Sequence, residues 1–428
     1  MPQFRAPRGT RDLLPDARAG LGRLETLARS LMARYGYREM EIPLFEQTAV
    51  FERGIGETTD VVEKELFRLA PRTEDSEAWA LRPEATAGIV RAYVQHGMQT
   101  LPQPVKLSVM GPMFRYDRPQ AGRYRQFWQW DAEAIGDGGP AVDAEVIEMG
   151  WRFYVEAGLP NVQVLVSSIG DSACRPQYLA ALKSYFRGHE ASLAETEKRR
   201  LETNPLRLLD SKDPVMAPLI AAAPTMADSL CDACRAHFDS LLEHLDPLGV
   251  PYRLEPTLVR GLDYYARTAF EYYRHGAEGQ QQALGGGGRY DGLIELLGGR
   301  PTPAIGFALG LDRVLLALEE TGATAAADAP ILAVIAGADP ADTGSRLRLA
   351  SMLRAEGLAV RAELANRKLG RQLETASRDH AHFAVIIGDE LADGHVQLKD
   401  LEAGTQRLVA LTELAKDLAR AQKSHHHG

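Results

Sequence analysis

The chain has 428 residues, of which 45% are hydrophobic and 25% are charged, and its formal net charge is −9. This length predicts two or three domains, and the acidic balance argues against a general nucleic-acid coat while leaving a local RNA-binding patch open. No segment has the ~18–20 apolar residues of a membrane span or the apolar core of a secretory signal. Three cysteines (Cys174, Cys231, Cys234) are too few for a disulfide framework, so a reducing cytoplasm is the expected location.

The amino-terminal part of the chain alternates between helical and strand-like patterns. Its polar, glycine-bearing loop between about Tyr116 and Arg123 separates two apolar and aromatic runs, which predicts a hairpin. The expected order is a helix within 14–41, a strand broken at Pro43 within 37–47, a loop leading into a helix over 80–97, and the two hairpin strands within 105–136.

The composition changes at about Asp171, where a charged and helical stretch begins. Residues 171–252 therefore predict an inserted helical subdomain. Strand signals return at Leu254 and continue through "LVRGLDYYARTAFEY" at 258–272. Residues 304–320 then predict a strand, a glycine turn and a helix.

An alanine- and threonine-rich linker at 321–330 marks a domain boundary. Beyond it, strands alternate with helices, which predicts a compact α/β domain over 330–422 whose last helix covers 409–422. Residues 423–428 are interpreted as a disordered tail or tag remnant and excluded from fold reasoning.

Four arginines lie on or beside apolar, aromatic or glycine-rich segments: Arg115, Arg123, Arg260 and Arg313. A single arginine of this kind is more often solvated or ion-paired than functional. Four in separate contexts of this kind indicate an anion site, because the planar guanidinium binds phosphate in a bidentate manner. Several arginines around one polyphosphate would neutralise the charge that spreads during transfer at phosphorus.

Two glycine runs, 285–288 and 306–310, would let backbone approach a ligand closely, although a pair of tight turns explains each equally well. Neither run matches a Walker loop or a dinucleotide-binding fingerprint.

Potential acceptors of an ammonium group occur in two places. Glu84 and Thr86 lie where a loop enters a helix, and Gln129 and Glu133 share one face of a strand. Helix capping or surface exposure is the alternative for the first pair. Tyr264 and Tyr265 are similarly open to interpretation as ligand contacts or as core aromatics with satisfied hydroxyls.

Cys231 and Cys234 are spaced C-x-x-C, with His237 nearby. Structural zinc needs four ligands, usually from two such pairs, and no second pair exists in the sequence. These cysteines are therefore interpreted as helix residues of the insertion, and no protein-only metal site is expected.

Together these segments resemble class II aminoacyl-tRNA synthetases, and closely the bacterial histidyl-tRNA synthetases, over nearly the whole chain. "PRGTRDLLP" resembles that family's opening signature, "YGYREMEIPLFEQTAVF" motif 1, "FRYDRPQAGRYRQFWQ" motif 2 and "GFALGLDR" motif 3. "LVRGLDYYARTAFEY" and "GGGGRYDGL" resemble the two histidine-specific signatures. The resemblance implies an antiparallel-sheet catalytic domain over 1–325, with the helical insertion, and an α/β anticodon-binding domain over 330–422.

The implied reaction is ATP-dependent activation of L-histidine to histidyl-adenylate, followed by transfer to the 3′ end of tRNA(His). The resemblance places Arg260 and Arg115 at the α-phosphate as catalytic residues, and Arg123 and Arg313 at the γ-phosphate of ATP. Magnesium is expected with the nucleotide. The histidine ligands that it implies are Glu84, Thr86, Gln129, Glu133, Arg260, Tyr264, Tyr265 and Tyr290.

Two positions depart from the family pattern, since Asp117 in motif 2 and Asp312 in motif 3 stand where the family usually has glutamate. Each keeps the charge with a shorter reach, and both are expected to serve ATP or metal contacts. Gln120, in the motif 2 loop, is implied to contact the acceptor end of the tRNA.

The resemblance also implies a homodimer, because motif 1, with Pro43, builds the two-fold interface in this family. In the carboxy-terminal domain a basic cluster could meet anticodon-stem phosphates, although a solvated helix face explains any single member as well. The cluster consists of Arg361, Arg367, Lys368 and Arg371.

Two other functions fit parts of the pattern. A non-catalytic regulatory paralogue that partners ATP phosphoribosyltransferase shares the catalytic fold, but typically lacks the anticodon domain and has degraded histidine-specific motifs. Synthetases for threonine, proline or glycine share motifs 1–3 but not "GLDYY" and "GGGGRYDGL" in this arrangement. The presence of Arg260 and of a full carboxy-terminal domain favours the histidine enzyme.

Overall fold

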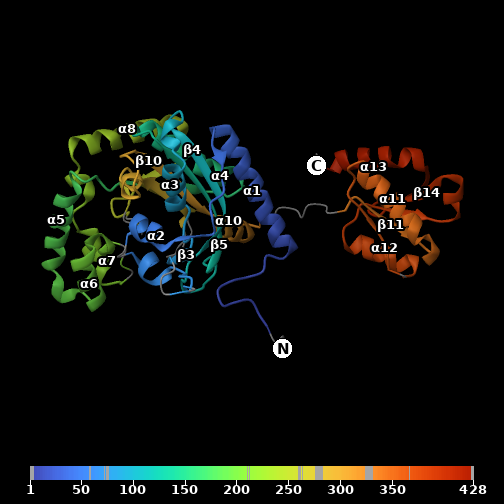
Figure 1. Cartoon of the computed structure of the whole chain (residues 1–428), viewed down its shortest axis with the longest axis horizontal. Helices are drawn as coiled ribbons and strands as arrows, with labels where there is room; N and C mark the ends of the chain where they lie inside the picture. Colours follow the sequence, from blue (N-terminus) through green and yellow to red (C-terminus); the bar gives the residue numbers. More distant parts are fainter. Residues whose placement is uncertain are drawn as a thin grey trace. The chain divides into compact units, whose positions relative to one another are not determined.

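The computed structural model describes the chain in two compact units, Met1–Ala325 and Ala326–Gly428 (Figure 1). Among the described residues, none of the helices combines the length and the apolar character that a bilayer crossing needs. The described residues are 4–56, 59–71, 73, 77–209, 211, 213–258, 262, 264–274, 283–322, 331–365 and 367–425.

The first unit is built on an eight-stranded sheet in the order β1-β4-β5-β10-β9-β8-β6-β7. The six central strands pair antiparallel, and only the two short edge strands, β1 and β7, pair parallel to their neighbours. This confirms the predicted antiparallel sheet. The strands are β1 (Arg38–Glu39), β4 (Val105–Phe114), β5 (Gln126–Ile135), β10 (Ala304–Gly310), β9 (Ala283–Arg289), β8 (Ala266–Arg274), β6 (Val162–Ser168) and β7 (Tyr252–Leu254).

Helices cover one face of this sheet, and strand alternation determines which side chains meet them. On β5, Trp130, Ala132 and Ala134 are buried in the core that these helices share with the sheet. The intervening residues of β5 therefore point to the opposite face. The covering helices are α1 (Pro15–Tyr35), α4 (Pro140–Glu156), α8 (Asp232–Leu248) and α10 (Leu311–Glu320).

The opposite face is bordered by a second core, in which Ile89 and Tyr93 of α3 (Thr86–Gln95) pack with β4 and with α9 (Leu293–Leu296). Beside α3 lie α2 (Thr48–Ile55), a π-helical turn (Val61–Glu65) and the two-stranded sheet of β2 (Phe45–Gln47) and β3 (Trp79–Leu81). The strand broken at Pro43 is thus observed as β1 and β2.

The chain between β6 and β7 is helical and has a small core of its own (Figure 1). Leu182 and Phe186 of one helix pack there against Leu201 and Met216 of two others. The helices that precede α8 are α5 (Arg175–Arg187), α6 (Glu195–Thr203) and α7 (Met216–Ala221).

The second unit has a five-stranded sheet in the order β12-β11-β13-β14-β15, with β12, β11 and β13 parallel and the last two strands antiparallel. Leu349 and Leu353 of α11 and Leu414 and Leu418 of α13 share one core with it. The elements are β11 (Ala333–Gly337), α11 (Thr343–Ala355), β12 (Val360–Ala362), α12 (Leu369–Arg378), β13 (Phe383–Ile387), β14 (His395–Asp400), β15 (Gln406–Ala410) and α13 (Leu411–His425).

One alternative from the sequence is excluded, and one prediction needs correction. The glycines at 285–288 do not form the tight turn that was the alternative to ligand approach, but lie inside strand β9, where a Cβ at Gly287 would come 2.0 Å from the Gly306 carbonyl oxygen. The last helix begins at Leu411 rather than at Val409, because Gln406–Ala410 pairs with β14 as a further strand.

A fully buried ion pair connects the sheet of the first unit to the helices that cover it. The guanidinium of Arg289 on β9 pairs with the Asp143 carboxylate on α4, and both side chains are fully buried. Asp143 Oδ2 also accepts a 2.6 Å hydrogen bond from the Thr268 hydroxyl of β8 and lies 2.8 Å from His237 Nε2 of α8. Four elements therefore meet at one carboxylate.

We expect Asp143→Ala to destabilise the first unit by about 3–5 kcal/mol, because it leaves the Arg289 charge buried without its partner. Urea unfolding followed by circular dichroism measures the change. The exposed pair Arg29–Glu39, with 3.0 Å between Nε and Oε2, provides the control, and Glu39→Ala should cost less than about 1 kcal/mol. Equal losses in the two variants would contradict this role.

Candidate active site

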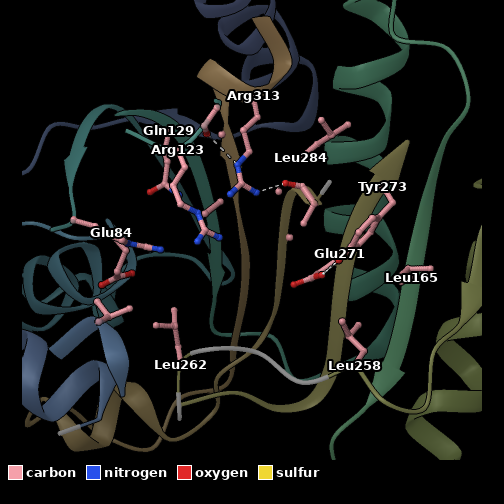
Figure 2. A pocket seen from close by; sticks show the side chains of 18 of the residues that line it. Glu84, Arg123, Gln129, Leu165, Leu258, Leu262, Glu271, Tyr273, Leu284 and Arg313 are labelled. Carbon is pink, nitrogen blue, oxygen red and sulfur yellow. Dashed lines mark hydrogen bonds between the residues drawn. The ribbon is translucent and has the colours of Figure 1, made fainter. Parts of the chain in front are cut away.

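A cavity of about 850 Å³ opens on the face of the sheet that the helices leave uncovered. Its floor comes from alternate residues of adjacent strands, including Gln129 of β5, Gly286 of β9 and Glu271 of β8. Figure 2 shows Glu84 and Glu271 on opposite sides of the cavity. Ten of the residues predicted to form the site line it: Glu84, Thr86, Arg115, Asp117, Arg123, Gln129, Tyr264, Tyr265, Asp312 and Arg313.

Three predicted arginines converge on this cavity from the hairpin and from α10. Figure 2 shows Arg123 and Arg313 close together near its centre. Burial, and then the neighbouring positive charges of Arg123 and Arg115, lower the pKa of Arg313 from its ordinary value. Arg115 is held by a 2.8 Å hydrogen bond from its Nε to the Pro83 carbonyl. The clustered positive charge indicates an anion-binding wall.

Arg260 lies outside the described residues, as does Asp263, so the structure does not test its place. Leu258 and Leu262, which flank Arg260 in the sequence, both line the cavity. The segment that carries the first histidine-specific signature therefore borders the site.

The Glu84 carboxylate caps helix α3. Its Oε2 accepts a 2.7 Å bond from the Thr86 amide, and its Oε1 accepts a 3.0 Å bond from the Ala87 amide. Burial raises the pKa of Glu84, while these bonds oppose that shift. Glu84 therefore caps the helix, which was the alternative to ligand binding, and it also lines the cavity.

Glu133 does not line the cavity but lies behind residues that do. Its Oε1 accepts a 2.6 Å bond from the Thr86 hydroxyl and its Oε2 a 2.6 Å bond from the Tyr290 hydroxyl. Burial raises the pKa of Glu133 to about 8. Neither Glu133 nor Tyr290 contributes to the cavity lining, so both support Thr86 and the tyrosine cluster from below.

The aromatic residues form one cluster. The ring centroids of Tyr264 and Tyr265 are 4.6 Å apart, and those of Tyr264 and Tyr290 are 5.7 Å apart. Burial raises the pKa of Tyr264 and of Tyr290 well above the ordinary value, so both hydroxyls stay protonated. The cluster provides an apolar wall with polar tips.

Three buried acceptor atoms on β5 have no hydrogen-bond partner among the described residues. They are Oε1 of Gln129, whose side chain is 8% exposed, and both carboxylate oxygens of Asp131, which is fully buried. Burial, Glu133 and Glu84 raise the pKa of Asp131 well above its ordinary value. Asp131 was missed in the sequence, although the period-two alternation that links Gln129 and Glu133 places it on the same face.

The two aspartates that depart from the family pattern both line the cavity but differ in their contacts. Asp117 Oδ2 lies 3.1 Å from an Nη of Arg123. Asp312 accepts a 2.6 Å bond at Oδ1 from Arg11 and a 2.6 Å bond at Oδ2 from the Trp128 amide. Asp312 thus joins the opening signature, motif 2 and motif 3 in one contact.

Gln120 lies at the tip of the motif 2 hairpin, where its backbone exchanges bonds of 3.2 and 3.0 Å with that of Arg123. It is not part of the cavity lining, whereas Gly122, Arg123 and Tyr124 of the same loop are.

Further basic residues of the lining were not predicted. Arg200 and Arg207 come from the helical insertion, and Arg207 forms a 2.8 Å ion pair with Asp60. Arg253 and Arg274 extend the basic wall along β7 and β8. No local motif marks them, because the tertiary fold alone brings the insertion to the cavity.

Comparison with known proteins assigns the chain to a family. The family model described as histidyl-tRNA synthetase matches residues 9–314, and that of an anticodon binding domain matches residues 332–420. Two curated relatives named histidine--tRNA ligase are each 44% identical. The one from Symbiobacterium thermophilum covers 98% of this chain and 99% of its own, and the one from Moorella thermoacetica covers 97% and 98%.

A solved structure gives the same result. The apo histidyl-tRNA synthetase of S. aureus superposes with a TM-score of 0.82 at 35% identity, over 97% of this chain and 100% of its own. The predicted fold class, with a catalytic sheet domain and an α/β anticodon-binding domain, is confirmed. The chain therefore belongs to the histidyl-tRNA synthetase family.

Proposed function

We propose that this chain activates L-histidine with ATP to form histidyl-adenylate and transfers the histidyl group to the 3′ end of tRNA(His). The observation that carries the proposal is one cavity lined by two unlike sets of groups, which we call the acceptor wall and the arginine wall. The buried acceptors Glu84 and Gln129 form the first, and the clustered arginines Arg115, Arg123 and Arg313 form the second. An amino acid and a polyphosphate require this combination of charges.

The acceptor wall suits the ammonium end and the imidazole of histidine. Gln129 Oε1 is a buried acceptor without a partner, and it would take an N–H of the substrate. Glu84 adds a carboxylate that is fixed by the start of α3. Thr86, Tyr264 and Tyr265 complete the wall, with Glu133 and Tyr290 as positioning residues behind it. A site that hydrogen-bonds the imidazole rejects apolar isosteres strongly, so no editing site is required.

The arginine wall suits ATP. A carboxylate oxygen of histidine attacks the α-phosphorus, the new O–P bond forms, and the bond to the β-phosphate oxygen breaks to release pyrophosphate. Arg115, together with Arg260 of the histidine-specific signature, would stabilise the charge at the α-phosphate. Arg123 and Arg313 would bind the γ-phosphate. The residues mainly hold charge and geometry, because this transfer needs little proton chemistry.

The carboxylates of the cavity determine where magnesium could bind, because this ion prefers carboxylate, phosphate and water oxygens. Asp117 at the cavity fits such an ion if Arg123 exchanges its carboxylate for phosphate. Asp312 does not fit, because Arg11 and the Trp128 amide already occupy its two oxygens. When bound with the nucleotide, magnesium would neutralise part of the β- and γ-phosphate charge. We therefore assign Asp312 a positioning role.

The tRNA would reach the cavity past the motif 2 hairpin, where Gln120 is placed for the acceptor end. The second unit matches an anticodon binding domain, and its basic cluster of Arg361, Arg367, Lys368 and Arg371 is proposed to meet stem phosphates. Arg361 already forms a 2.6 Å ion pair with Asp379, so it is the member of the cluster least available for a phosphate contact. A cytoplasmic location is proposed with this role, and fractionation of the native cells tests it.

Amino-acid-dependent ATP–pyrophosphate exchange across all twenty amino acids tests the first half-reaction. We expect exchange with histidine only and a loss of at least ~10²-fold in Arg260→Ala, since this variant removes charge stabilisation at the α-phosphate. Arg300→Ala, on an exposed loop, should keep full exchange. Histidine binding without exchange would instead support the regulatory paralogue. Exchange with threonine, proline or glycine would support another synthetase.

The variants Asp117→Ala and Asp312→Ala should distinguish the roles of the two aspartates by their different kinetic effects. We expect Asp117→Ala to raise the KM for ATP by about tenfold, a loss of ~1.4 kcal/mol of binding. Asp312→Ala should lower kcat and also stability, because it leaves the partly buried Trp128 amide and Arg11 without their acceptor. Asp117→Glu serves as the conservative control. Unchanged kinetics in both alanine variants would refute both roles.

A homodimer is proposed from the exposed apolar surface of motif 1. Leu44, Phe45 and Trp79 are each more than 40% exposed, and the rings of Phe45 and Trp79 lie 5.3 Å apart. Light scattering should give about twice the 46.9 kDa of one chain. The double variant Phe45→Asp/Trp79→Asp should be monomeric, and Leu296→Asp, an exposed position on α9, should not. A monomeric wild type would exclude this dimer.

A further inference from the structure

Four side chains with metal-binding atoms meet at the base of the helical insertion. Asp171 and Cys174 lie between β6 and α5, and Cys231 and Cys234 lie at the start of α8. Their ligand atoms, one from each residue, all lie within 4.8 Å of one another. His237 is not part of this group, since its Nε2 contacts Asp143.

Two distances within the cluster match those around a tetrahedral zinc ion. Zinc–sulfur bonds of ~2.3 Å and zinc–oxygen bonds of ~2.0 Å place two sulfurs about 3.8 Å apart and a sulfur and an oxygen about 3.5 Å apart. The observed distances are 3.8 Å between Cys174 Sγ and Cys234 Sγ and 3.6 Å between Cys174 Sγ and Asp171 Oδ1. A disulfide would need ~2.05 Å, and the cysteines are free.

The local sequence builds this geometry from both segments. Cys231 is the N-cap residue of α8 and Cys234 follows it by three positions, so both thiols face the same side of the first turn. Gly170 has a φ of +64°, and a Cβ there would come 2.8 Å from Cys174 Sγ and 2.0 Å from Met226 Cε. Only glycine therefore allows the loop to bring Cys174 to Cys234.

The carboxylate is oriented as a ligand by its own contacts. Arg267 lies 3.3 Å from Asp171 Oδ2, and the Ala173 amide donates a 3.0 Å bond to Oδ1. Oδ1 is thereby turned toward the Cys174 thiol. Support of this kind, from residues that do not touch the ion, is typical of protein metal sites.

We propose that Asp171, Cys174, Cys231 and Cys234 bind one structural Zn²⁺ ion. Three thiolates and one carboxylate in a tetrahedron suit zinc, and four protein ligands leave no open position for catalysis. This proposal revises the sequence interpretation of Cys231 and Cys234. The second ligand pair exists as D-x-x-C at 171–174 rather than as a second C-x-x-C.

The site would link the insertion to the wall of the active site. Arg175 follows Cys174 directly, and its guanidinium donates to the carbonyls of Ile169, Gly170 and Tyr265 at 3.2, 3.2 and 2.5 Å. Tyr265 lines the cavity. A metal that fixes Cys174 therefore also fixes the loop on which Arg175 and the Tyr265 carbonyl meet.

Metal content of the full-length chain, purified under reducing conditions without a metal-affinity resin, tests the proposal. We expect about one zinc per chain after dialysis against a weak chelator. Cys231→Ser should reduce the retained zinc at least ~10-fold, as should Asp171→Asn. His244→Ala, an exposed histidine on the same helix, should retain it. All variants carry the same carboxy-terminal histidines, so binding there cannot produce the difference.

Cobalt titration of the wild-type chain gives a second readout that does not depend on the folding of a variant. Three thiolate ligands should give an intense thiolate-to-cobalt absorption band that added zinc abolishes. Absence of both zinc and this band would overturn the proposal, as would zinc content unchanged in Cys231→Ser. A thiol titration that finds one free cysteine, because Cys174 and Cys234 are oxidised to a disulfide, would overturn it as well.

Discussion

The active-site architecture depends on the buried carboxylate of Asp143. Arg289, Thr268 and His237 all direct a donor or ring nitrogen to it from β9, β8 and α8. Removing two charges from water costs several kcal/mol for each ion, and this cost is offset only when partners surround the pair. The geometry that satisfies Asp143 therefore also sets how β8 and β9, two strands of the cavity floor, lie on helix α4.

The sheet separates apolar and polar functions by alternation alone. On β5, Trp130 and Ala132 face the helices, while Gln129 and Asp131 face the cavity side. On β10, position 306 has room only for glycine, because a Cβ there would collide with the Glu133 carboxylate. Gly306 of motif 3 thus leaves room for a polar group on the neighbouring strand β5. In β9, Gly287 allows close packing against β10, while Gly285 and Gly286 line the cavity.

Local patterns predicted much of this architecture, and contacts between distant segments account for what they missed. The motif 2 hairpin and the three arginines that line the cavity (Arg115, Arg123 and Arg313) followed from alternation and residue chemistry, because each signal lies within one segment. The hydrogen bond from Arg11 to Asp312 could not be predicted in this way, because only the fold brings the opening signature to motif 3. The last two residues of strand β15, Val409 and Ala410, were assigned to the following helix because they continue its apolar pattern. The Asp171–Cys174 pair escaped attention because a search for paired cysteines ignores a carboxylate ligand.

Burial shifts the pKa values of acidic and of basic groups in and around the cavity before any substrate binds. Burial raises the pKa of Glu84, Asp131 and Glu133, and mutual repulsion adds to the shift of Asp131 and of Glu133. Among the basic groups, burial and repulsion by Arg123 and Arg115 lower the pKa of Arg313. Each set of groups would gain from a ligand of the opposite charge, because an unpaired buried polar group is costly. A substrate pair that carries both an ammonium group and phosphates would therefore be stabilised by both sets together.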